Sequence, residues 1–240
     1  ARRHWAKALM NAQLADESIE KLAVFNYEYG RALGVTCFFD ERYRMAVTVK
    51  HGNIFTSNAQ TLVNTVNTVG VMGAGIALEC RLRAPQMFER YVTLCESQQI
   101  QIGQLWLYRK STPWFLNFPT KQHWRYPSKE AYLLQGLQKF VDSYEARAIE
   151  SIAFPILGAD KGGIDADRSL SIMQRYLCQV SIPVEIYHYD PTAIDDLYEK
   201  TKRWFLSQPL ESAAQLTGIR PQYLTPLREA MGRDDVCQLN

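Results

Sequence analysis

The feature that most constrains the fold is residues 61–77, which read TLVNTVNTVGVMGAGIA. The first part, with Asn64 and Asn67, has the length and β-branched content of a buried strand. Three glycines within the next loop leave its backbone N–H groups without side-chain cover, and the loop runs into a helix-like segment. Such a loop favours an anion such as phosphate, although the same residues suit a tight turn without a ligand. Asn67, at the strand end, can bond a sugar hydroxyl without adding charge.

From residue 44 onward, predicted strands and helices alternate along the chain. This order predicts an α/β layered domain whose mixed sheet is covered by helices and whose ligand lies at the carboxyl ends of the strands. We expect a helical extension over 1–44, the α/β domain over 45–206 and a short helical tail over 207–240. The predicted strands are 44–52, 61–67, 104–110, 113–119, 151–157 and 183–190, and the predicted helices are 84–99, 128–148, 165–180 and 191–205. Ser128 is the expected cap of the second helix, and Pro191 is expected in the first turn of the last.

Composition excludes several classes of function. A net charge of +2 gives no bulk attraction to nucleic acid or membrane. Five cysteines without a C-x-x-C pair argue for reduced thiols in a cytoplasmic protein, and the four histidines lack the spacing of a metal site. No apolar run is long enough to span a membrane. The glycine loop matches neither the dinucleotide fingerprint nor a P-loop, which removes dehydrogenases and nucleotide triphosphatases.

Three further loops follow predicted strands and carry residues suited to a nucleotide. GADKGGID at 158–165 adds a second glycine loop, so that two loops could grip a pyrophosphate from both sides. NFPTKQHWRYPSK at 117–129 mixes basic and aromatic residues, which suits a stacked base and a phosphate backbone. Within it, Lys121 follows a strand directly, and a partly desolvated lysine can act as nucleophile or base. Asn53, after the first strand, is placed to read an adenine edge.

Together HGNIF, LVNTVNTVGVMGAGIALEC, LNFPTKQHW and PILGADKGGID resemble a macrodomain over about residues 45–190. More narrowly they resemble the DarG type, an antitoxin macrodomain that removes ADP-ribose from DNA and is related to the terminal ADP-ribose glycohydrolase group. The resemblance implies a three-layer α/β/α fold with a mixed six-stranded sheet. It also implies a hydrolase acting on N-glycosyl ADP-ribose linkages, with no cofactor beside the ligand ADP-ribose. The implied partners are ADP-ribosylated DNA, single-stranded in preference, and a cognate ADP-ribosyltransferase toxin.

The resemblance also assigns residue roles. Lys121 would attack or assist at the anomeric carbon of the distal ribose, and Asn67 would hold that ribose. His123, Trp124 and Arg125 would contact nucleic acid. The residues implied to bind ADP-ribose are Asn53, Ile54, Asn64, Gly70, Val71, Met72, Gly73, Ala74, Gly75, Ile76, Thr120, Pro155, Leu157, Gly158, Ala159, Asp160, Lys161, Gly162 and Gly163.

Two departures from the family pattern bear on the substrate. Ala74 stands where DarG proteins usually carry a lysine between two glycines, and Asp160 would lie close to a diphosphate. They leave open a macrodomain that binds ADP-ribose without cleaving it, or one that acts on modified protein. A third hypothesis is a DNA-binding regulator, because Ala214, Gly218 and Leu224 in residues 211–231 have helix-turn-helix spacing. A helical hairpin that packs on the macrodomain is the alternative for that segment.

Overall fold

The computed structural model of the chain describes residues 47–193 and 195–232. The described residues all belong to one unit of the chain, Met45–Asn240. The helical extension predicted over 1–44 lies outside the described residues.

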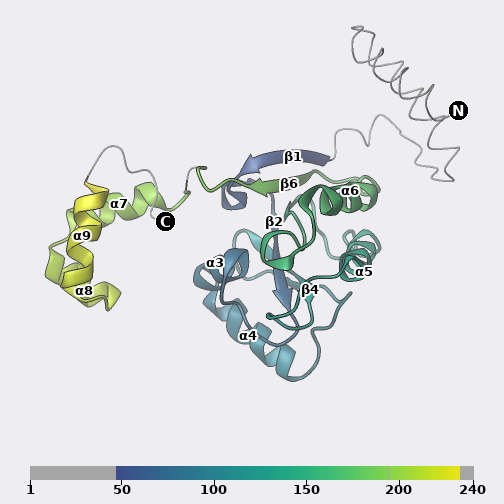
Figure 1. Ribbon diagram of the computed structural model, residues 1–240, viewed down its shortest axis with the longest axis horizontal. Coiled ribbons are helices and arrows are strands. Elements are labelled where there is room, and N and C mark those ends of the chain that lie inside the picture. Colours follow the sequence, from purple (N-terminus) through teal and green to yellow (C-terminus); the bar gives the residue numbers. More distant parts are fainter. Residues whose placement is uncertain (1–46, 194, 233–240) are drawn as a thin grey trace, which may run out of the picture. The chain divides into compact units, whose positions relative to one another are not determined.

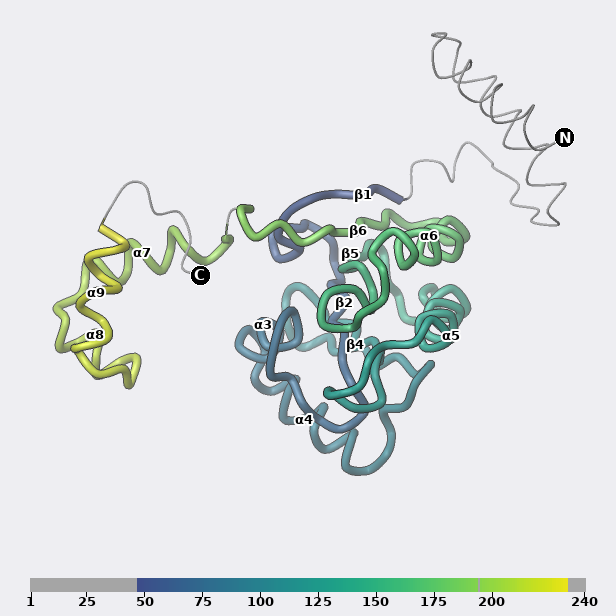
Figure 2. The backbone as a smooth tube through the Cα atoms, in the orientation of Figure 1, coloured from purple at the N-terminus to yellow at the C-terminus, as the bar shows by residue number. Residues whose placement is uncertain are grey.

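A mixed six-stranded sheet forms the centre of the described region (Figure 1). The strands run in the order β1-β6-β5-β2-β4-β3, and Figure 2 shows β5 between β6 and β2. All neighbours pair in parallel except β3, which pairs antiparallel with β4. The strands are β1 (Val47–Gly52), β2 (Thr61–Asn67), β3 (Trp106–Tyr108), β4 (Trp114–Lys121), β5 (Ile152–Pro155) and β6 (Val184–Tyr189).

Helices cover both faces of this sheet, which makes the three layers that the sequence predicted (Figure 1). On one face, α5 (Glu130–Val141) and α6 (Ala166–Leu177) bury leucine, phenylalanine and methionine side chains against the sheet. On the other face, α3 (Gly75–Arg83) buries an alanine and a cysteine, and α4 (Pro85–Glu96) buries methionine, tyrosine, leucine and cysteine side chains. Because alternate residues of a strand point to opposite faces, Val63 of β2 belongs to the first core and Leu62 to the second.

Two local predictions about helix starts were wrong. Helix α7 spans Tyr198–Ser207 and does not begin at Pro191, because Asp190 accepts hydrogen bonds from the backbone N and the Oγ1 of Thr192 at 2.8 and 2.7 Å. Such side-chain bonds to nearby backbone compete with helix formation. Helix α5 has Lys129 at its N-cap position with no side-chain cap, so Ser128 does not cap it. The Ser128 hydroxyl is buried without a hydrogen-bond partner.

The C-terminal helices α7, α8 (Leu210–Thr217) and α9 (Pro221–Met231) share a small apolar core. Its buried members come from all three helices: Tyr198, Phe205, Ala213, Leu224 and Met231. The sequence predicted a short helical tail with a helix-turn-helix or a helical hairpin over residues 211–231, and the structure has two helices there, α8 and α9. Among the described residues, no helix has the length and apolar character needed to cross a membrane.

Gly136 shows how closely α5 approaches the sheet. A Cβ atom added to Gly136 would lie 2.2 Å from Cζ and 2.4 Å from Cε1 of Phe118, whose side chain is fully buried in β4. Alanine is favoured over glycine within a helix by about 0.5–1 kcal/mol. Overpacking of a dense core typically costs about 1–3 kcal/mol. The clash with Phe118 therefore outweighs the helix preference for alanine, and the substitution destabilises the fold.

We therefore expect Gly136→Ala to lower the free energy of unfolding by about 1–2 kcal/mol, measured by urea denaturation. Lys139→Ala, at an exposed position of the same helix, is the matched control and should change stability little. Combining Gly136→Ala with Phe118→Leu should recover part of the loss, because the smaller side chain makes room for the new methyl group. A Gly136→Ala variant as stable as the wild type would contradict this account of the contact.

Candidate active site

The carboxyl ends of the parallel strands open onto three loops that we treat as one candidate site. The first loop is residues 68–74 after β2, the second is residues 156–165 after β5, and the third is residues 122–129 after β4. Direct hydrogen bonds join them. Thr68 in the first loop donates through N and Oγ1 to the carbonyl of Gln122 in the third, and Ser128 N donates to the carbonyl of Gly162 in the second.

Asn67 and Lys121 lie opposite each other on neighbouring strands. The pairing of β2 with β4 shifts by one residue between Val66 and Asn67, so that Asn67 aligns with Lys121 and not with Thr120. Irregular pairing of this kind re-aims side chains at the end of a sheet. The two residues that the sequence predicted as catalytic are therefore neighbours, although 54 positions separate them in the chain.

The side chain of Asn67 is used to hold the first loop. Its Oδ1 accepts from Val69 N at 3.0 Å, from Val71 N at 3.3 Å and from the Tyr91 hydroxyl at 3.1 Å, while Nδ2 donates to the Val71 carbonyl at 2.6 Å. Tyr91, fully buried on α4, also donates to the Asn67 carbonyl at 2.6 Å. Burial raises the pKa of the Tyr91 hydroxyl, which keeps it protonated as a donor. This network gives Asn67 a loop-shaping role that sequence reasoning missed.

The backbone of the first loop suits an anion. Gly70 and Gly75 have φ angles of +78° and +54°, which favour glycine. Helix α3 starts directly after Ala74, which has no side chain able to cap it. Its first N–H groups therefore face the loop without a protein cap, and the helix dipole adds a partial positive charge there. Asn64 and Met72 support the loop from below, joined by a contact of 3.8 Å between Nδ2 and Sδ.

The second loop is tightly folded against the third. Gly158 has a φ of +67°, and a Cβ atom there would lie 2.9 Å from the Ile164 side chain. A Cβ atom on Gly162 would lie 2.8 Å from Oγ of Ser128. Asp160 has a φ of +46°, a left-handed conformation that is uncommon for a residue other than glycine. The left-handed backbone of Gly158 therefore favours glycine, a side chain at residue 162 would displace the Ser128 hydroxyl, and Asp160 is held in a strained turn at the surface of the loop.

Lys121 joins the second and third loops. It ends β4, is half-buried, and its Nζ donates to the carbonyl oxygen of Lys161 in the second loop. Burial lowers the pKa of the Lys121 amine below its ordinary value, and the negative charge of Asp160 partly opposes this shift. The result is an amine with a raised neutral fraction, placed between two glycine loops.

The predicted nucleic-acid contacts form a surface cluster on the third loop. The His123 ring stacks on Trp124 with a centroid distance of 5.5 Å, and the Arg125 guanidinium lies over Trp124 at 4.6 Å. The Arg125 backbone N also donates to Nδ1 of His123 at 3.2 Å. Trp124 is 46% exposed, so a flat apolar face with an adjacent positive charge is open to solvent.

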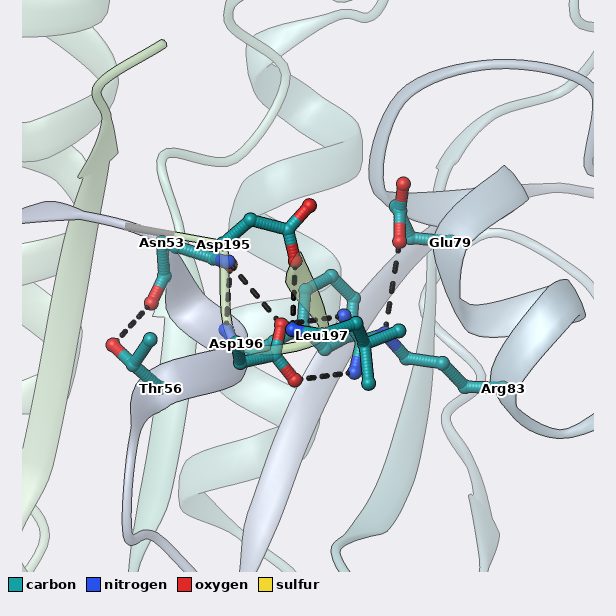
Figure 3. Close-up of polar contacts among 8 residues, drawn as sticks. Asn53, Thr56, Glu79, Arg83, Asp195, Asp196 and Leu197 are labelled. Atoms are coloured by element: carbon teal, nitrogen blue, oxygen red, sulfur yellow. Dashed lines mark hydrogen bonds and ion pairs between the residues drawn. The ribbon is translucent and has the colours of Figure 1, made fainter. Parts of the chain in front are cut away.

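Arg83 and Asp196, which sequence reasoning missed, lie at the Asn53 end of the site (Figure 3). Arg83 donates through both terminal nitrogens to Asp196 at 2.7 Å and lies over the Phe55 ring at 4.0 Å. Burial lowers the pKa of the Arg83 guanidinium, but the hydrogen bond and charge of Asp196 outweigh it and raise the pKa overall. Asn53 Nδ2 donates to Asp196 at 3.4 Å. A side-chain pair across 113 positions leaves no local signal in the sequence.

Beside Asn53 the surface is hollowed by a cavity of about 580 Å³. Its lining includes Gly52 and Asn53 from the end of β1, Tyr187 from β6 and Ala193 from the following turn. The volume lies within the range of small-molecule sites, which run from about 300 to 1,000 Å³. This hollow therefore offers room beside the residue that the sequence predicted to read adenine.

The predicted ligand-binding residues divide into a surface set and a supporting set. Exposed or half-buried positions are Asn53, Gly70, Val71, Gly73, Ala74, Gly75, Ile76, Pro155, Ala159, Asp160, Lys161 and Gly163. Fully buried positions are Ile54, Asn64, Met72, Thr120, Leu157, Gly158 and Gly162. The buried residues pack under the loops and support their conformation, whereas the surface residues are accessible to a ligand.

Comparison with known proteins agrees with this architecture. Residues 63–173 match the family model "Macro domain". A Thermus aquaticus protein named DNA ADP-ribosyl glycohydrolase is 39% identical over 144 residues, which is 58% of this chain and 40% of that protein. The chain thus spans about 40% of the length of this curated relative.

Two solved structures give the same result. The macrodomain of Thermus aquaticus DarG is 36% identical with a TM-score of 0.56, and the match covers 60% of this chain and 99% of that one. Thermosipho africanus DarTG in complex with ADP-ribose is 32% identical with a TM-score of 0.58, covering 65% of this chain and 44% of that one. The chain therefore belongs to the macrodomain family, in its DarG-type group.

Proposed function

We propose that this macrodomain hydrolyses the bond between ADP-ribose and a nucleic-acid base, with DNA as the favoured substrate. The observation that carries the proposal is Lys121, a half-buried amine with a lowered pKa, aligned with Asn67 and placed between two glycine loops. The relative from Thermus aquaticus is named for this activity. In the proposed pose, the diphosphate lies between the first and second loops, with its charge at the start of α3.

In the proposed reaction, Lys121 acts as the nucleophile. Its neutral Nζ attacks the anomeric carbon of the distal ribose, the bond from that carbon to the base nitrogen breaks, and the base leaves with a proton from the amine. The sugar ring opens to a Schiff base, which water hydrolyses to free ADP-ribose and regenerated lysine. Asn67 contributes by fixing the first loop, so that the ribose is presented to Lys121 in one orientation.

The surface of the third loop favours a single-stranded substrate. A base inside a duplex is stacked and its glycosidic bond is hard to reach, whereas an unstacked base can lie on an aromatic side chain. Trp124, with the Arg125 guanidinium over its ring, supplies such a platform on the loop that follows Lys121. We infer a cognate ADP-ribosyltransferase as the source of the mark, since a relative from Thermosipho africanus is named as a transferase–glycohydrolase fusion. An enzyme acting on genomic DNA as an antitoxin or repair activity would work in the cytoplasm.

Removal of the Lys121 amine should abolish turnover and spare binding. We expect Lys121→Ala to lose release of ADP-ribose from a single-stranded oligonucleotide with one ADP-ribosylated base, while calorimetry still detects ADP-ribose binding. Lys121→Arg should also be inactive, because guanidinium stays charged and cannot form a Schiff base. Lys110→Ala, an exposed lysine outside the three loops, is the control. Full activity in Lys121→Ala would refute the lysine mechanism, and binding without release by the wild type would indicate a reader.

The pH dependence should report the Lys121 amine. Because its neutral form is the nucleophile and its pKa is lowered, kcat/KM should rise with pH through a midpoint below 10.5. Asp160 opposes that lowering, so Asp160→Asn should move the midpoint to lower pH. The measurement is kcat/KM between pH 6 and about 10 for both proteins. A shift to higher pH, or none, would show that the Asp160 charge does not act on Lys121.

Trp124→Ala should weaken substrate binding without changing the chemistry. Loss of base stacking typically costs about 1–3 kcal/mol, so we expect KM for the modified oligonucleotide to rise with kcat unchanged. Affinity for free ADP-ribose should stay the same, because Trp124 lies outside the two glycine loops. Trp204→Ala, which removes an exposed tryptophan of α7 outside the three loops and outside α8 and α9, serves as the comparison. A fall in kcat at unchanged KM would argue against a stacking platform.

A further inference from the structure

Helices α8 and α9 have the short glycine-containing connection of a helix-turn-helix. They are joined by residues 218–220, a three-residue turn (Figure 1). Gly218 ends α8 with a φ of +69° and donates its N–H to the Ala214 carbonyl at 2.9 Å. Turns of three or four residues that contain glycine are typical of this motif. A residue other than glycine at position 218 would have a strained backbone at this φ, so glycine is needed to redirect the chain between the two helices.

The inner faces of α8 and α9 contribute buried apolar side chains to one shared core. Ala213 on α8 and Leu224 on α9 are fully buried, and α7 adds Tyr198 and Phe205 to the same cluster. Small residues where two helices meet allow the close approach that the motif needs. Arg228 of α9 also donates to the carbonyls of Leu206 and Gln208 at 2.9 and 2.6 Å, at the end of α7. Helix α9 is therefore held in one orientation by both apolar and polar contacts.

The outer surface around the start of α9 carries no acidic residue, and it mixes polar side chains with the exposed apolar residues Leu216 and Ile219. Arg220, Gln222 and Tyr223 are exposed there, and Tyr223 is 62% exposed. No acidic residue occurs between Glu211 and Glu229, a stretch that contains two arginines. Repulsion of a phosphate backbone is thus absent along the whole turn and most of α9.

We propose that α8 and α9 bind duplex DNA, with the start of α9 in the major groove. In a helix-turn-helix, the N-terminal residues of the second helix meet base edges while the first helix crosses the backbone. Gln222 carries the amide that pairs bidentately with adenine, and Arg220 supplies a charge for phosphate or guanine. Tyr223 adds an apolar ring with a hydroxyl beside them. This activity is separate from the proposed glycohydrolase reaction, because it needs neither ADP-ribose nor Lys121.

The test is fluorescence anisotropy of the whole chain with an unmodified 24-base-pair duplex of mixed sequence, titrated across salt from about 50 to 200 mM. We expect binding that weakens with salt. Arg220→Gln should reduce the slope of log K against log salt by about one, as expected for one lost phosphate contact. Gln222→Ala with Tyr223→Ala should weaken binding severalfold with the slope unchanged. Arg175→Gln removes the same charge from an exposed position of α6 and should leave duplex binding intact.

Two controls distinguish duplex binding by α8 and α9 from loss of folding and from the proposed glycohydrolase site. Each variant should keep its far-UV circular dichroism and its ADP-ribose affinity, which shows that the fold and the macrodomain site are intact. Lys121→Ala should bind the duplex like the wild type even if it has lost turnover. Absence of duplex binding by the wild type at about 50 mM salt, or equal binding by the Arg220 and Gln222/Tyr223 variants, would overturn the proposal. A dimer in sedimentation that Gln222→Ala with Tyr223→Ala dissociates, without DNA binding, would assign this face to a second copy instead.

Discussion

The alignment of Asn67 with Lys121 is the constraint on which the rest of the site depends. It arises from one irregular step in the pairing of β2 with β4, at the carboxyl end of the sheet. From that point Asn67 orders the first loop through Val69, Val71 and Tyr91, and Lys121 reaches the second loop at Lys161. Three loops distant in sequence are thereby fixed around one amine, and the neutral fraction of that amine is set by burial and by Asp160.

The site combines rigid and open parts. Buried residues such as Asn64, Met72 and Gly162 fix the loops from beneath, whereas the glycine backbone at their surface stays accessible. Such a division suits a polyanionic ligand, because backbone N–H groups bind phosphate without the charge or bulk of side chains. At the other end, the Arg83–Asp196 pair joins α3 to the segment that precedes α7. The candidate site is thus connected by specific contacts to the chain that leads to the C-terminal helices.

The C-terminal helices give the chain a second surface of different chemistry. The buried residues of their core begin at Tyr198, and the stretch between Glu211 and Glu229 contains two arginines and no acidic residue. An ADP-ribose site and a DNA-binding face on one polypeptide would let the protein act on DNA lesions or respond to them. Local charge, and not the total of +2, decides whether such a surface can meet a phosphate backbone.

The sequence by itself determined the three-layer fold, the family and the loops that follow β1, β2, β4 and β5, because glycine spacing and apolar alternation are local signals. It also proposed Lys121 and Asn67 as catalytic residues, through motifs that span only a few residues. Only the tertiary structure decided that Asn67 holds the first loop, that Arg83 pairs with Asp196 and that α7 begins at Tyr198. The Arg83–Asp196 pair joins residues 113 positions apart, so no local pattern records it. The bonds of Asn67 to Val69 and Val71 and of Asp190 to Thr192 span only two to four residues, but the same residue types also fit a strand end or a helix start, and the sequence pattern does not choose between these conformations.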